Sequence, residues 1–492
     1  MREDKMQQVD LVIRSGRLYT MNADRTVYAD GAIAIQGDEI VAVGPTHTID
    51  DVYEGKTVLN ARDQAILPGL IDTHIHPVLN LRPGLGEEPA DGFGFQAVAG
   101  APEPTNPLDE SVLPDALARA AHREHGANLD AFFAEAGILD IVPPVVTYSL
   151  ARHSLMCAVR AGATTFIEGG GGSVEGVAEA ALSIGMRAGV GYPAFDQLVN
   201  ASSPQEGMQR IRDTEAVLVA CEEAAKRWHG QGEGLLSSWL VPTVDVAASD
   251  ELLAGLRQLM ETYDLPVMAH SATTLSHDPY SQHHYGKTCI QRMADAGLME
   301  HHWLGIHMGF FNDGDLDLLL SKPAHIAHCP STSAKCGKGI MANGVLLDAM
   351  RKGVNVGLGS DTPGNGNMVR EMQMSVACHR DGLGDSRALP PYKALEMATR
   401  DGARAAALGG KTGELCPGMK ADVITLDTSR PEYDNQETVN ALLSLGHAGD
   451  VCHSIINGRI VMQDRRFPGL DEEEVRRDMR AANAVISQMM GG

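Results

Sequence analysis

The sequence predicts an α/β protein, namely a (β/α)8 TIM barrel with a small β-sandwich domain built from both chain ends. Short β-rich runs occupy the first 67 residues. Apolar strands then alternate with amphipathic helices to about residue 415, after which short β-rich runs return. The predicted parts are 1–67 and 416–470 for the small β domain, 68–415 for the barrel, and 471–492 for a terminal helix.

The first β-rich part contains three runs punctuated by Gly and Asp turns, which are Leu11–Thr20, Gly31–Gly44 and Thr57–Asn60. Such runs are typical of short strands. Pro68-Gly69 breaks the pattern, so the N-terminal part of the β domain is expected to end there.

The middle of the chain alternates between apolar and amphipathic runs. Strands are predicted at 163–167, 240–244, 265–269, 304–306, 324–327 and 355–359, and helices at 174–183, 208–228, 249–263 and 391–408. Alternation over this length favours a parallel barrel, in which the chemistry lies at the C-terminal ends of the strands. The Gly/Pro-rich segment 79–130 breaks the alternation and is predicted to be a lid over the barrel mouth.

Two β-rich runs follow Gly413, at Gly418–Asp427 and Val451–Met462. Asn457-Gly458, within the second run, is a strong hairpin signal because both residue types accept positive φ. We expect these runs to join the N-terminal strands in one small domain, with the barrel inserted between them. A helix at Asp471–Met489 closes the chain.

Composition limits the partners and the compartment. The 492-residue chain has a formal net charge of −24 and no basic run, which argues against nucleic acid and anionic membranes as partners. Its eight cysteines are scattered without a CxxC pair, as in reduced intracellular chains. No signal-type apolar core or run of about 18 apolar residues occurs, so a cytoplasmic location is expected. The expected partners are a small-molecule substrate and further copies of the chain in a homo-oligomer.

An apolar run ends in His74-Ile75-His76, and Pro77 then stops the strand. Residues i and i+2 of a strand point to the same face, so both imidazoles are expected to lie together. Two neutral imidazoles suit a divalent metal such as zinc. Such pairs also occur by chance, so partners elsewhere in the chain must decide.

Polar residues follow four later apolar strands in the same relative place, and they are His270, His307, His328 and Asp361. Each has an alternative explanation, since a strand-end His is commonly a hydrogen-bonded core residue and Gly-Ser-Asp can cap a helix. Because strand ends of a parallel barrel meet at one mouth, these residues are expected to converge with the His pair.

The motifs resemble those of the amidohydrolase superfamily, in its cytosine-deaminase and triazine-hydrolase-like branch with a single metal. In type the chain is similar to molinate and phenylurea hydrolases. The resemblance runs from Pro68-Gly-Leu-Ile-Asp-Thr-His-Ile-His through His270, His307, His328-Cys-Pro-Ser-Thr-Ser and Gly357-Leu-Gly-Ser-Asp to Gly418-Met-Lys-Ala-Asp-Val and Ile456-Asn-Gly-Arg.

This resemblance implies a ligand set of His74, His76, His270 and Asp361 for one divalent metal per chain. Zinc is expected, and iron, cobalt or manganese would also accept these nitrogen and oxygen ligands. Asp361 would take the proton of the metal-bound water, and His307 would hydrogen-bond that water or the substrate oxygen.

The chain departs from this branch where its deaminases carry a Glu three residues after the third His ligand, because Thr273 stands there. Pro242-Thr-Val244 also replaces the Pro-His-Ala of nucleoside-type deaminases, and Thr332-Ser333 replaces a Ser-Asn pair. Leaving-group protonation would then fall to another residue, with His277, His283 and His284 as candidates and exposed loop positions as the alternative for each. The predicted substrate contacts are His328, Thr273 and His277.

Three hypotheses follow for function. The first is a metal-dependent hydrolase that cleaves an amide, urea, carbamate or thiocarbamate C–N or C–S bond, as the absence of the Glu favours. The second is a deaminase or chlorohydrolase of an N-heterocycle, which needs another residue in the place of that Glu. The third is an inactive amidohydrolase-like scaffold, whose signature would be lost ligands, and none is lost.

Overall fold

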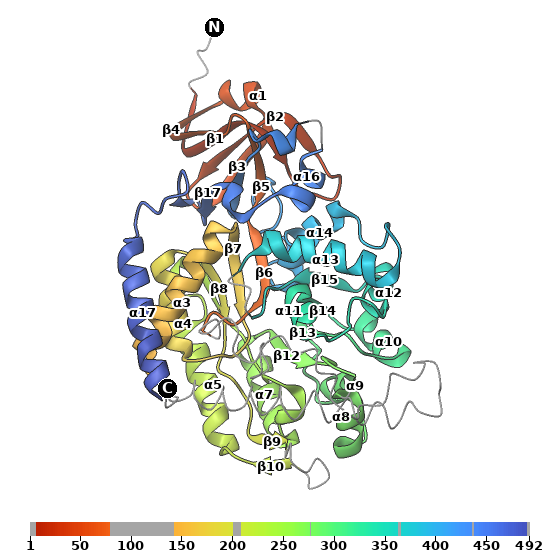
Figure 1. Ribbon diagram of the computed structural model, residues 1–492. Coiled ribbons are helices and arrows are strands. Elements are labelled where there is room, and N and C mark those ends of the chain that lie inside the picture. Colours follow the sequence, from red (N-terminus) through yellow and green to blue (C-terminus); the bar gives the residue numbers. More distant parts are fainter. Residues whose placement is uncertain are drawn as a thin grey trace.

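The computed structural model describes residues 6–78, 142–199, 208–275, 277–362, 366–434 and 437–489. The predicted lid at 79–130 lies outside them. Figure 1 shows a β-rich part above a larger part in which helices surround strands, with helix α17 (Glu472–Met489) along one side. No helix in the described ranges is both long enough and apolar enough to cross a bilayer.

Strands from both chain ends form one eight-stranded sheet, ordered β18-β17-β16-β5-β1-β2-β3, with β4 paired to β1. They are β1 (Gln7–Tyr19), β2 (Val27–Gln36), β3 (Glu39–Pro45), β4 (Tyr53–Asn60), β5 (Gln64–Pro68), β16 (Val423–Asp427), β17 (Val451–Ile456) and β18 (Arg459–Met462). Strand β16 runs antiparallel to β5, with Val423 opposite Pro68. The two ends of the chain are thus joined directly by backbone hydrogen bonds.

Two apolar clusters lie within this sheet part. Leu11, Ile13 and Leu18 of β1 belong to one cluster, and Val9 and Val12 of the same strand belong to the other. The strands nevertheless form one continuous hydrogen-bonded sheet. The prediction of a small β-sandwich domain from both chain ends is therefore confirmed only in part, because the strands form one sheet.

The central part contains two four-stranded parallel sheets, ordered β11-β8-β7-β6 and β12-β13-β14-β15. Their strands are β6 (Leu70–Ile75), β7 (Ala163–Glu168), β8 (Arg187–Val190), β11 (Leu236–Ser238), β12 (Val267–Ser271), β13 (Trp303–His307), β14 (Ala324–His328) and β15 (Asn355–Leu358). Single parallel bridges, Leu240 to Val267 and Ile75 to Asp361, link the two sheets at both edges. All strand ends that carry candidate site residues therefore face the same way.

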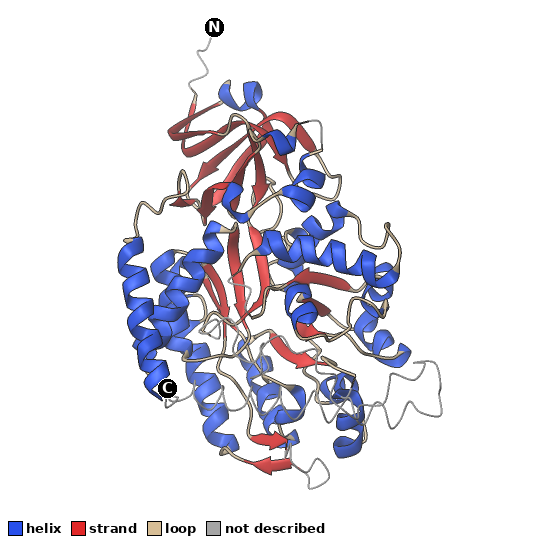
Figure 2. Cartoon of the chain, in the orientation of Figure 1, coloured by secondary structure: helices blue, strands red, loops and turns tan. Residues whose placement is uncertain are grey.

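Helices lie on the outer side of these strands (Figure 2). They are α3 (Pro144–Arg160), α4 (Val174–Ile184), α5 (Thr214–Trp228), α6 (Gln231–Gly234), α7 (Asp250–Tyr263), α8 (His277–Tyr285), α9 (Cys289–Asp295), α10 (Asp313–Ser321), α11 (Pro330–Lys335), α12 (Val345–Lys352), α13 (Met368–Leu383), α14 (Pro391–Met397) and α15 (Arg400–Ala405). Two further helices lie elsewhere: α1 (Thr46–Asp50) packs against β2 and β3 of the sheet part, and α16 (Thr438–Leu445) packs against α13 and α14. The single helical run predicted at 391–408 is divided into α14 and α15.

Local sequence signals explain where several helices begin and end. The Ser173 hydroxyl accepts the backbone N–H of Gly176 at the start of α4, and Gly185 ends that helix with a φ of 80°. Ser249 caps α7 in the same way by accepting the N–H of Leu252, and Asp264 ends it with a φ of 52°. These caps fix the strand–helix junctions of the central part.

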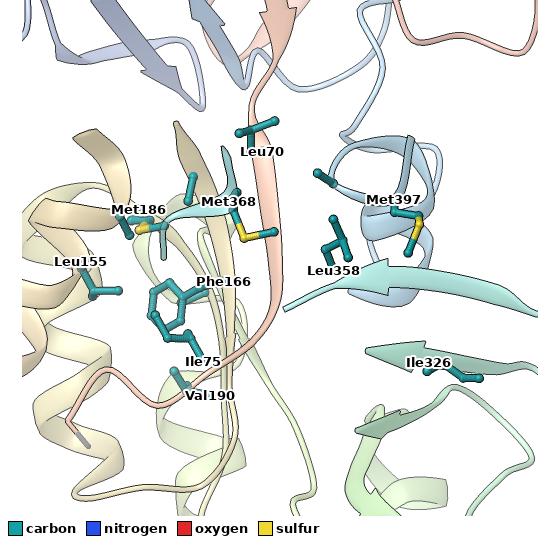
Figure 3. Packing of buried hydrophobic residues seen from close by; sticks show 14 of the residues in the cluster. Leu70, Ile75, Leu155, Phe166, Met186, Val190, Ile326, Leu358, Met368 and Met397 are labelled. Atoms are coloured by element: carbon teal, nitrogen blue, oxygen red, sulfur yellow. The ribbon is translucent and has the colours of Figure 1, made fainter. Parts of the chain in front are cut away.

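The largest apolar cluster packs the strands against the surrounding helices. Figure 3 shows Leu155 of α3 and Met186 beside Phe166 of β7, and Ile75 close to Val190. Phe166 is fully buried. Burial of side chains of this size stabilises the folded chain by roughly 1.5–3 kcal/mol each, so these contacts hold the strand ends in place.

A buried ion pair joins the central part to the sheet part. Arg187 of β8 donates to Asp422 from Nε at 2.9 Å and from Nη2 at 3.2 Å, and Nη2 also donates to Asn457. Removing one partner of such a pair leaves an uncompensated buried charge, which is strongly destabilising. The pair therefore fixes the two parts relative to each other.

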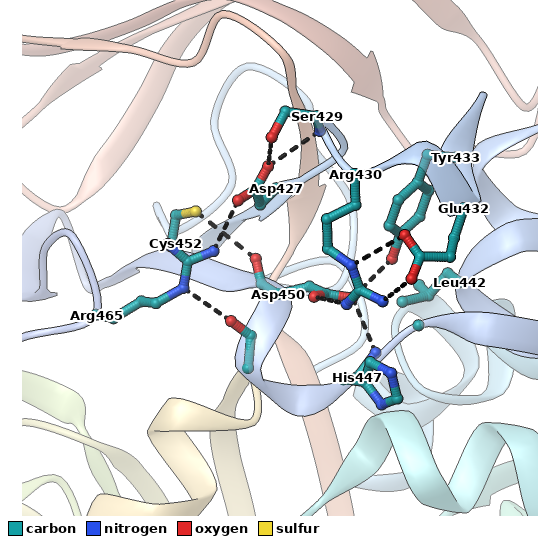
Figure 4. A network of polar contacts seen from close by, with 12 residues as sticks. Asp427, Ser429, Arg430, Glu432, Tyr433, Leu442, His447, Asp450, Cys452 and Arg465 are labelled. Carbon is teal, nitrogen blue, oxygen red and sulfur yellow. Dashed lines mark hydrogen bonds and ion pairs between the residues drawn. The ribbon is translucent and has the colours of Figure 1, made fainter.

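A second polar network holds the segment between β16 and β17 (Figure 4). Arg430 contacts Asp450 at 2.5 Å and Glu432 at 2.8 Å, and the Tyr433 hydroxyl donates to Asp450 at 2.9 Å. Arg465 contacts Asp427 of β16 at 2.9 Å. The last strands are thus anchored by charge-assisted hydrogen bonds.

Candidate metal centre

The two histidines of the first motif lie side by side at the end of β6. The exposed fraction of each side chain is close to zero, and their ring centroids are 4.7 Å apart. Gly169, just after β7, packs against both rings. A Cβ added there would lie 2.2 Å from His74 Cε1 and 2.6 Å from His76 Cε1, so only glycine leaves room for this pair.

His270 approaches the pair from the end of β12. Its ring centroid is 4.8 Å from that of His74, and its Nδ1–H donates to the carbonyl oxygen of Thr243 at 2.6 Å. A hydrogen bond from Nδ1 to a carbonyl leaves Nε2 unprotonated and fixes the ring orientation, as is usual for metal-binding histidines.

Asp361 follows β15 and closes the group. Its carboxylate oxygens lie 3.6 Å from His74 Nε2, 3.8 Å from His76 Nε2 and 3.4 Å from His307 Nε2. Its backbone N–H donates to the carbonyl of His74 at 2.8 Å. Asp361 and His307 both have positive φ, 50° and 68°, a backbone conformation uncommon for such residues that clusters at functional sites.

Burial and mutual charge set the protonation of these groups. Burial lowers the pKa of His74 to about 4, and it lowers the pKa values of His270 and His307 well below 6.5. Burial alone would raise the pKa of Asp361, but the contact with His74 and the interactions with His307 and His76 hold it well below 3.8. The group therefore presents neutral imidazoles and an ionised carboxylate, which is the state that binds a metal.

These residues fit one divalent metal ion. The ligand atoms of His74, His76 and His270 all lie within 4.8 Å of one another, and so do those of His74, His307 and Asp361. Neither ring nitrogen of His74 has a hydrogen-bond partner among the described residues. Buried polar atoms rarely stay unpaired, and a cation would satisfy them. Three imidazole nitrogens and one carboxylate oxygen suit zinc, iron, cobalt or manganese.

Two acidic residues that the motifs did not single out support this centre. Glu168, at the end of β7, lies 3.9 Å from His76 Nδ1, and its carboxylate accepts the N–H groups of Gly170 and Gly171 at 2.8 and 2.6 Å. The glycine-rich turn Gly169–Gly172, which follows β7, therefore binds the carboxylate of Glu168 through its backbone N–H groups. Glu168 occupies the same strand-end place as the predicted ligands, so that signal could have found it.

Asp72 links β6 to the segment that carries Asp361. It accepts hydrogen bonds from the backbone N–H and hydroxyl of Ser360 at 2.9 and 2.5 Å, and from the N–H of His74 at 3.2 Å. Burial raises the pKa of Asp72 to about 7. The Asp72 carboxyl group thus holds the backbone of His74 and the backbone next to Asp361, so it positions the first and the last predicted ligand.

Two of the predicted substrate contacts, His328 and Thr273, lie in different surroundings. His328 is buried at the end of β14 with its Nε2 3.3 Å from His379 Nε2, and it does not belong to either group of candidate ligands. Thr273 lies just beyond β12, and its hydroxyl oxygen is buried with no hydrogen-bond partner among the described residues. Contact of either residue with substrate stays a prediction.

His277 is buried, so the exposed alternative is wrong for this residue. Its Nε2 is 3.0 Å from Asp245, and its Nδ1 accepts the backbone N–H of Thr273 at 3.2 Å. Asp245 also accepts the hydroxyl of Ser271 at 2.7 Å. His277 thus ties the segment after His270 to the neighbouring strand end.

Lys338 is a further residue beside the centre that the predicted site did not include. It is partly buried, and its Nζ lies 3.2 Å from His307 Nε2. No motif pointed to this contact, because Lys338 lies on the irregular segment between α11 and α12.

The chain is similar to known proteins over nearly its whole length. Over 479 residues the chain is 28% identical to a 5-methylthioadenosine/S-adenosylhomocysteine deaminase of Syntrophobacter fumaroxidans, covering 96% of this chain and 97% of that one. An adenosine deaminase from Xanthomonas campestris with bound zinc superimposes with a TM-score of 0.80 at 20% identity, over 98% of this chain and all of that chain. A zinc complex of atrazine chlorohydrolase from Arthrobacter aurescens gives 0.76 at 19% identity, over 96% and 100%.

These relatives change the order of the functional hypotheses. They do not show the predicted closeness to molinate and phenylurea hydrolases. They favour the hypothesis of a heterocycle deaminase over that of an amide, urea, carbamate or thiocarbamate hydrolase. The family model for amidohydrolases matches residues 65–461, which span both parallel sheets and all five residues of the candidate centre. The chain therefore belongs to the amidohydrolase family and is a hydrolytic enzyme that acts on carbon–nitrogen bonds.

Proposed function

We propose that this enzyme is a hydrolytic deaminase that replaces an amino group on a ring carbon of an N-heterocycle, with adenine-type nucleosides as the first substrates to test. The complete set of His74, His76, His270 and Asp361 at one place carries this proposal. Similarity to deaminases over nearly the full chain supports it. We further propose that the two parallel sheets are halves of one eight-stranded barrel and that the enzyme binds one zinc ion per chain.

A divalent metal at this centre would supply a Lewis acid that makes water nucleophilic near neutral pH. Asp361, whose low pKa keeps it ionised, accepts the proton of the attacking water. The same carboxyl group can return that proton to the departing amine, so that ammonia leaves. We propose that His307, beside Asp361, contacts the attacking water or the substrate.

Thr273 cannot provide a proton near neutral pH, because an alcohol is a hydrogen-bonding group and not an acid there. The hydrogen bond from the Thr273 backbone to His277, and the contact of His277 with Asp245, hold this segment in place. We therefore propose that His277 positions the segment, and that the Thr273 hydroxyl contributes at most one hydrogen bond to the substrate.

Hydrolysis of an acyclic amide, urea, carbamate or thiocarbamate is the second candidate. The specific observation in its favour is Thr273, which stands where deaminases of this branch carry the proton-shuttling Glu.

A substrate panel separates the two candidates. Zinc-loaded protein is incubated with 5′-methylthioadenosine, S-adenosylhomocysteine, 5′-deoxyadenosine, guanine and cytosine, and in parallel with a phenylurea and a thiocarbamate. Ammonia is measured by a coupled assay, and aniline and thiol are measured by absorbance. Asp361→Asn protein serves as the control for contaminating activity. Ammonia from a heterocycle supports the deaminase, whereas aniline or thiol release without ammonia overturns it.

A further inference from the structure

A lysine approaches the candidate centre from a segment that supplies none of the ligands. Lys338 lies between α11 and α12, flanked by Gly337 and Gly339 with φ values of 63° and 74°. Its backbone N–H donates to the carbonyl of Ser333 at 3.0 Å. The side chain reaches inward until Nζ is 3.2 Å from His307 Nε2.

The direction of this contact is fixed by chemistry. An ammonium group has three donors and no acceptor, so Lys338 donates and the His307 nitrogen accepts. Asp361 Oδ2 lies 3.4 Å from the same nitrogen. The positive charge is therefore in contact with His307, which in turn lies beside Asp361, and two of its three N–H donors remain for other acceptors.

Lys338 differs from other lysines of this chain in its counter-charge. Lys322, Lys393 and Lys420 each have a carboxylate oxygen within 2.7 Å. Within the described part of the chain, no carboxylate oxygen lies within 4.0 Å of Lys338 Nζ, although the side chain is partly buried. A partly desolvated charge is costly unless something compensates it. A negative charge on the bound substrate would provide that compensation.

The reaction of the proposed deaminase creates such a charge. As the water oxygen bonds to the ring carbon, the electron pair of the adjacent C=N bond moves to the ring nitrogen. When the bond to the amino group breaks, that pair returns to the ring, and the amine leaves as ammonia with the proton held by Asp361. Thr273 cannot neutralise the ring nitrogen by protonation, whereas a nearby fixed cation can stabilise the negative charge on it.

We propose that Lys338 is a catalytic residue that stabilises the negative charge developing on the substrate at this centre. The proposal rests on the proposed deaminase function for the identity of the charged atom. A preorganised donor at a site of developing charge lowers the barrier because it needs no rearrangement during the reaction.

The test compares Lys338→Met and Lys338→Arg with Lys335→Gln, a matched control at an exposed position three residues earlier. We expect kcat for ammonia release to fall about 100-fold in Lys338→Met, with KM changed less than about threefold. Lys338→Arg keeps the charge and should lose less activity, and the control should match the unmodified enzyme. Bound metal, measured by elemental analysis, should be the same in all four proteins.

A second measurement does not depend on turnover. Azide is titrated into cobalt-loaded proteins and followed by the visible absorption of the cobalt ion. Loss of the Lys338 charge should raise the azide Kd about tenfold, because one nearby positive charge no longer attracts the anion. Lys338→Arg and Lys335→Gln should bind azide as the unmodified protein does.

The outcomes separate this proposal from the proposed function. If no heterocycle releases ammonia but azide binds more weakly to Lys338→Met, the deaminase proposal fails and the charge of Lys338 still acts at the centre. An unchanged azide Kd overturns the proposal for Lys338. So does a kcat within threefold of the unmodified enzyme, a rise in KM alone, or loss of bound metal, since these would indicate no role, ground-state binding or a structural role.

Discussion

Replacing Gly169 by Ala should disrupt the metal centre without changing any ligand. The new Cβ would lie 2.2 Å from His74 Cε1 and 2.6 Å from His76 Cε1, whereas carbon atoms pack at about 3.5–4.0 Å. The φ of Gly169 is not in the positive range, so the backbone itself accepts Ala. The whole effect is therefore steric, and each ring must move by about 1 Å or more.

Such a movement is large compared with the tolerance of a metal site, where ligand distances vary by about 0.2 Å. We expect metal affinity to fall at least about 100-fold, which is about 2.7 kcal/mol, and overpacking to cost a further 1–3 kcal/mol of folding stability. Affinity is measured by competition with a chromophoric chelator, and stability by urea unfolding of the metal-free protein.

The matched control is Gly469→Ala, because nothing lies within 4 Å of a Cβ added at Gly469. This variant should bind metal as the unmodified protein does. If Gly169→Ala bound zinc with unchanged affinity and kept full activity, the two rings would have room to retreat. The inference that this glycine is required by the imidazoles would then be wrong.

Three further predictions concern the centre. Asp361→Asn should keep a metal-binding oxygen but lower kcat by about 10²–10⁴-fold, since an amide cannot accept the proton; a loss below tenfold in steady-state assays would place the base elsewhere. Thr273→Ala should change kcat by less than about tenfold, because one neutral hydrogen bond is worth about 1 kcal/mol, and a larger loss would give Thr273 a chemical role. The metal-free protein should lose stability between pH 6.5 and about 4, because the unfolded chain binds a proton at His74 that the folded chain excludes. The loss from this residue alone is about 3 kcal/mol, and urea midpoints that do not change with pH would refute it.

The candidate centre was predictable because its residues share one simple property. His270, His307 and Asp361 each directly follow or end an apolar strand, and parallel strands bring such ends to the same side. The pair of His74 and His76 is visible from its spacing alone. Local pattern and strand direction were therefore sufficient to expect these five residues together.

Other parts depended on contacts that no local pattern encodes. Lys338 reaches His307 from an irregular segment, and its position depends on how that segment folds back over the strand ends. His277 is polar and follows a strand by several residues, yet it is buried by its contact with Asp245. Strands β8, Arg187-Ala-Gly-Val190, and β11, Leu236-Ser-Ser238, were missed because small and polar residues leave no apolar run in either of them.

The pairing of β16 with β5 has a consequence for how the chain reaches this structure. During synthesis β5 and Arg187 are made long before β16 and Asp422. Until those residues are made, one edge of β5 has no partner strand and Arg187 has no carboxylate to pair with. Contacts between distant segments form slowly, and open edges favour association between chains. The residues after 415 are therefore needed before a newly made chain can complete its sheet, and a chain that stops near residue 415 is expected to accumulate as aggregates.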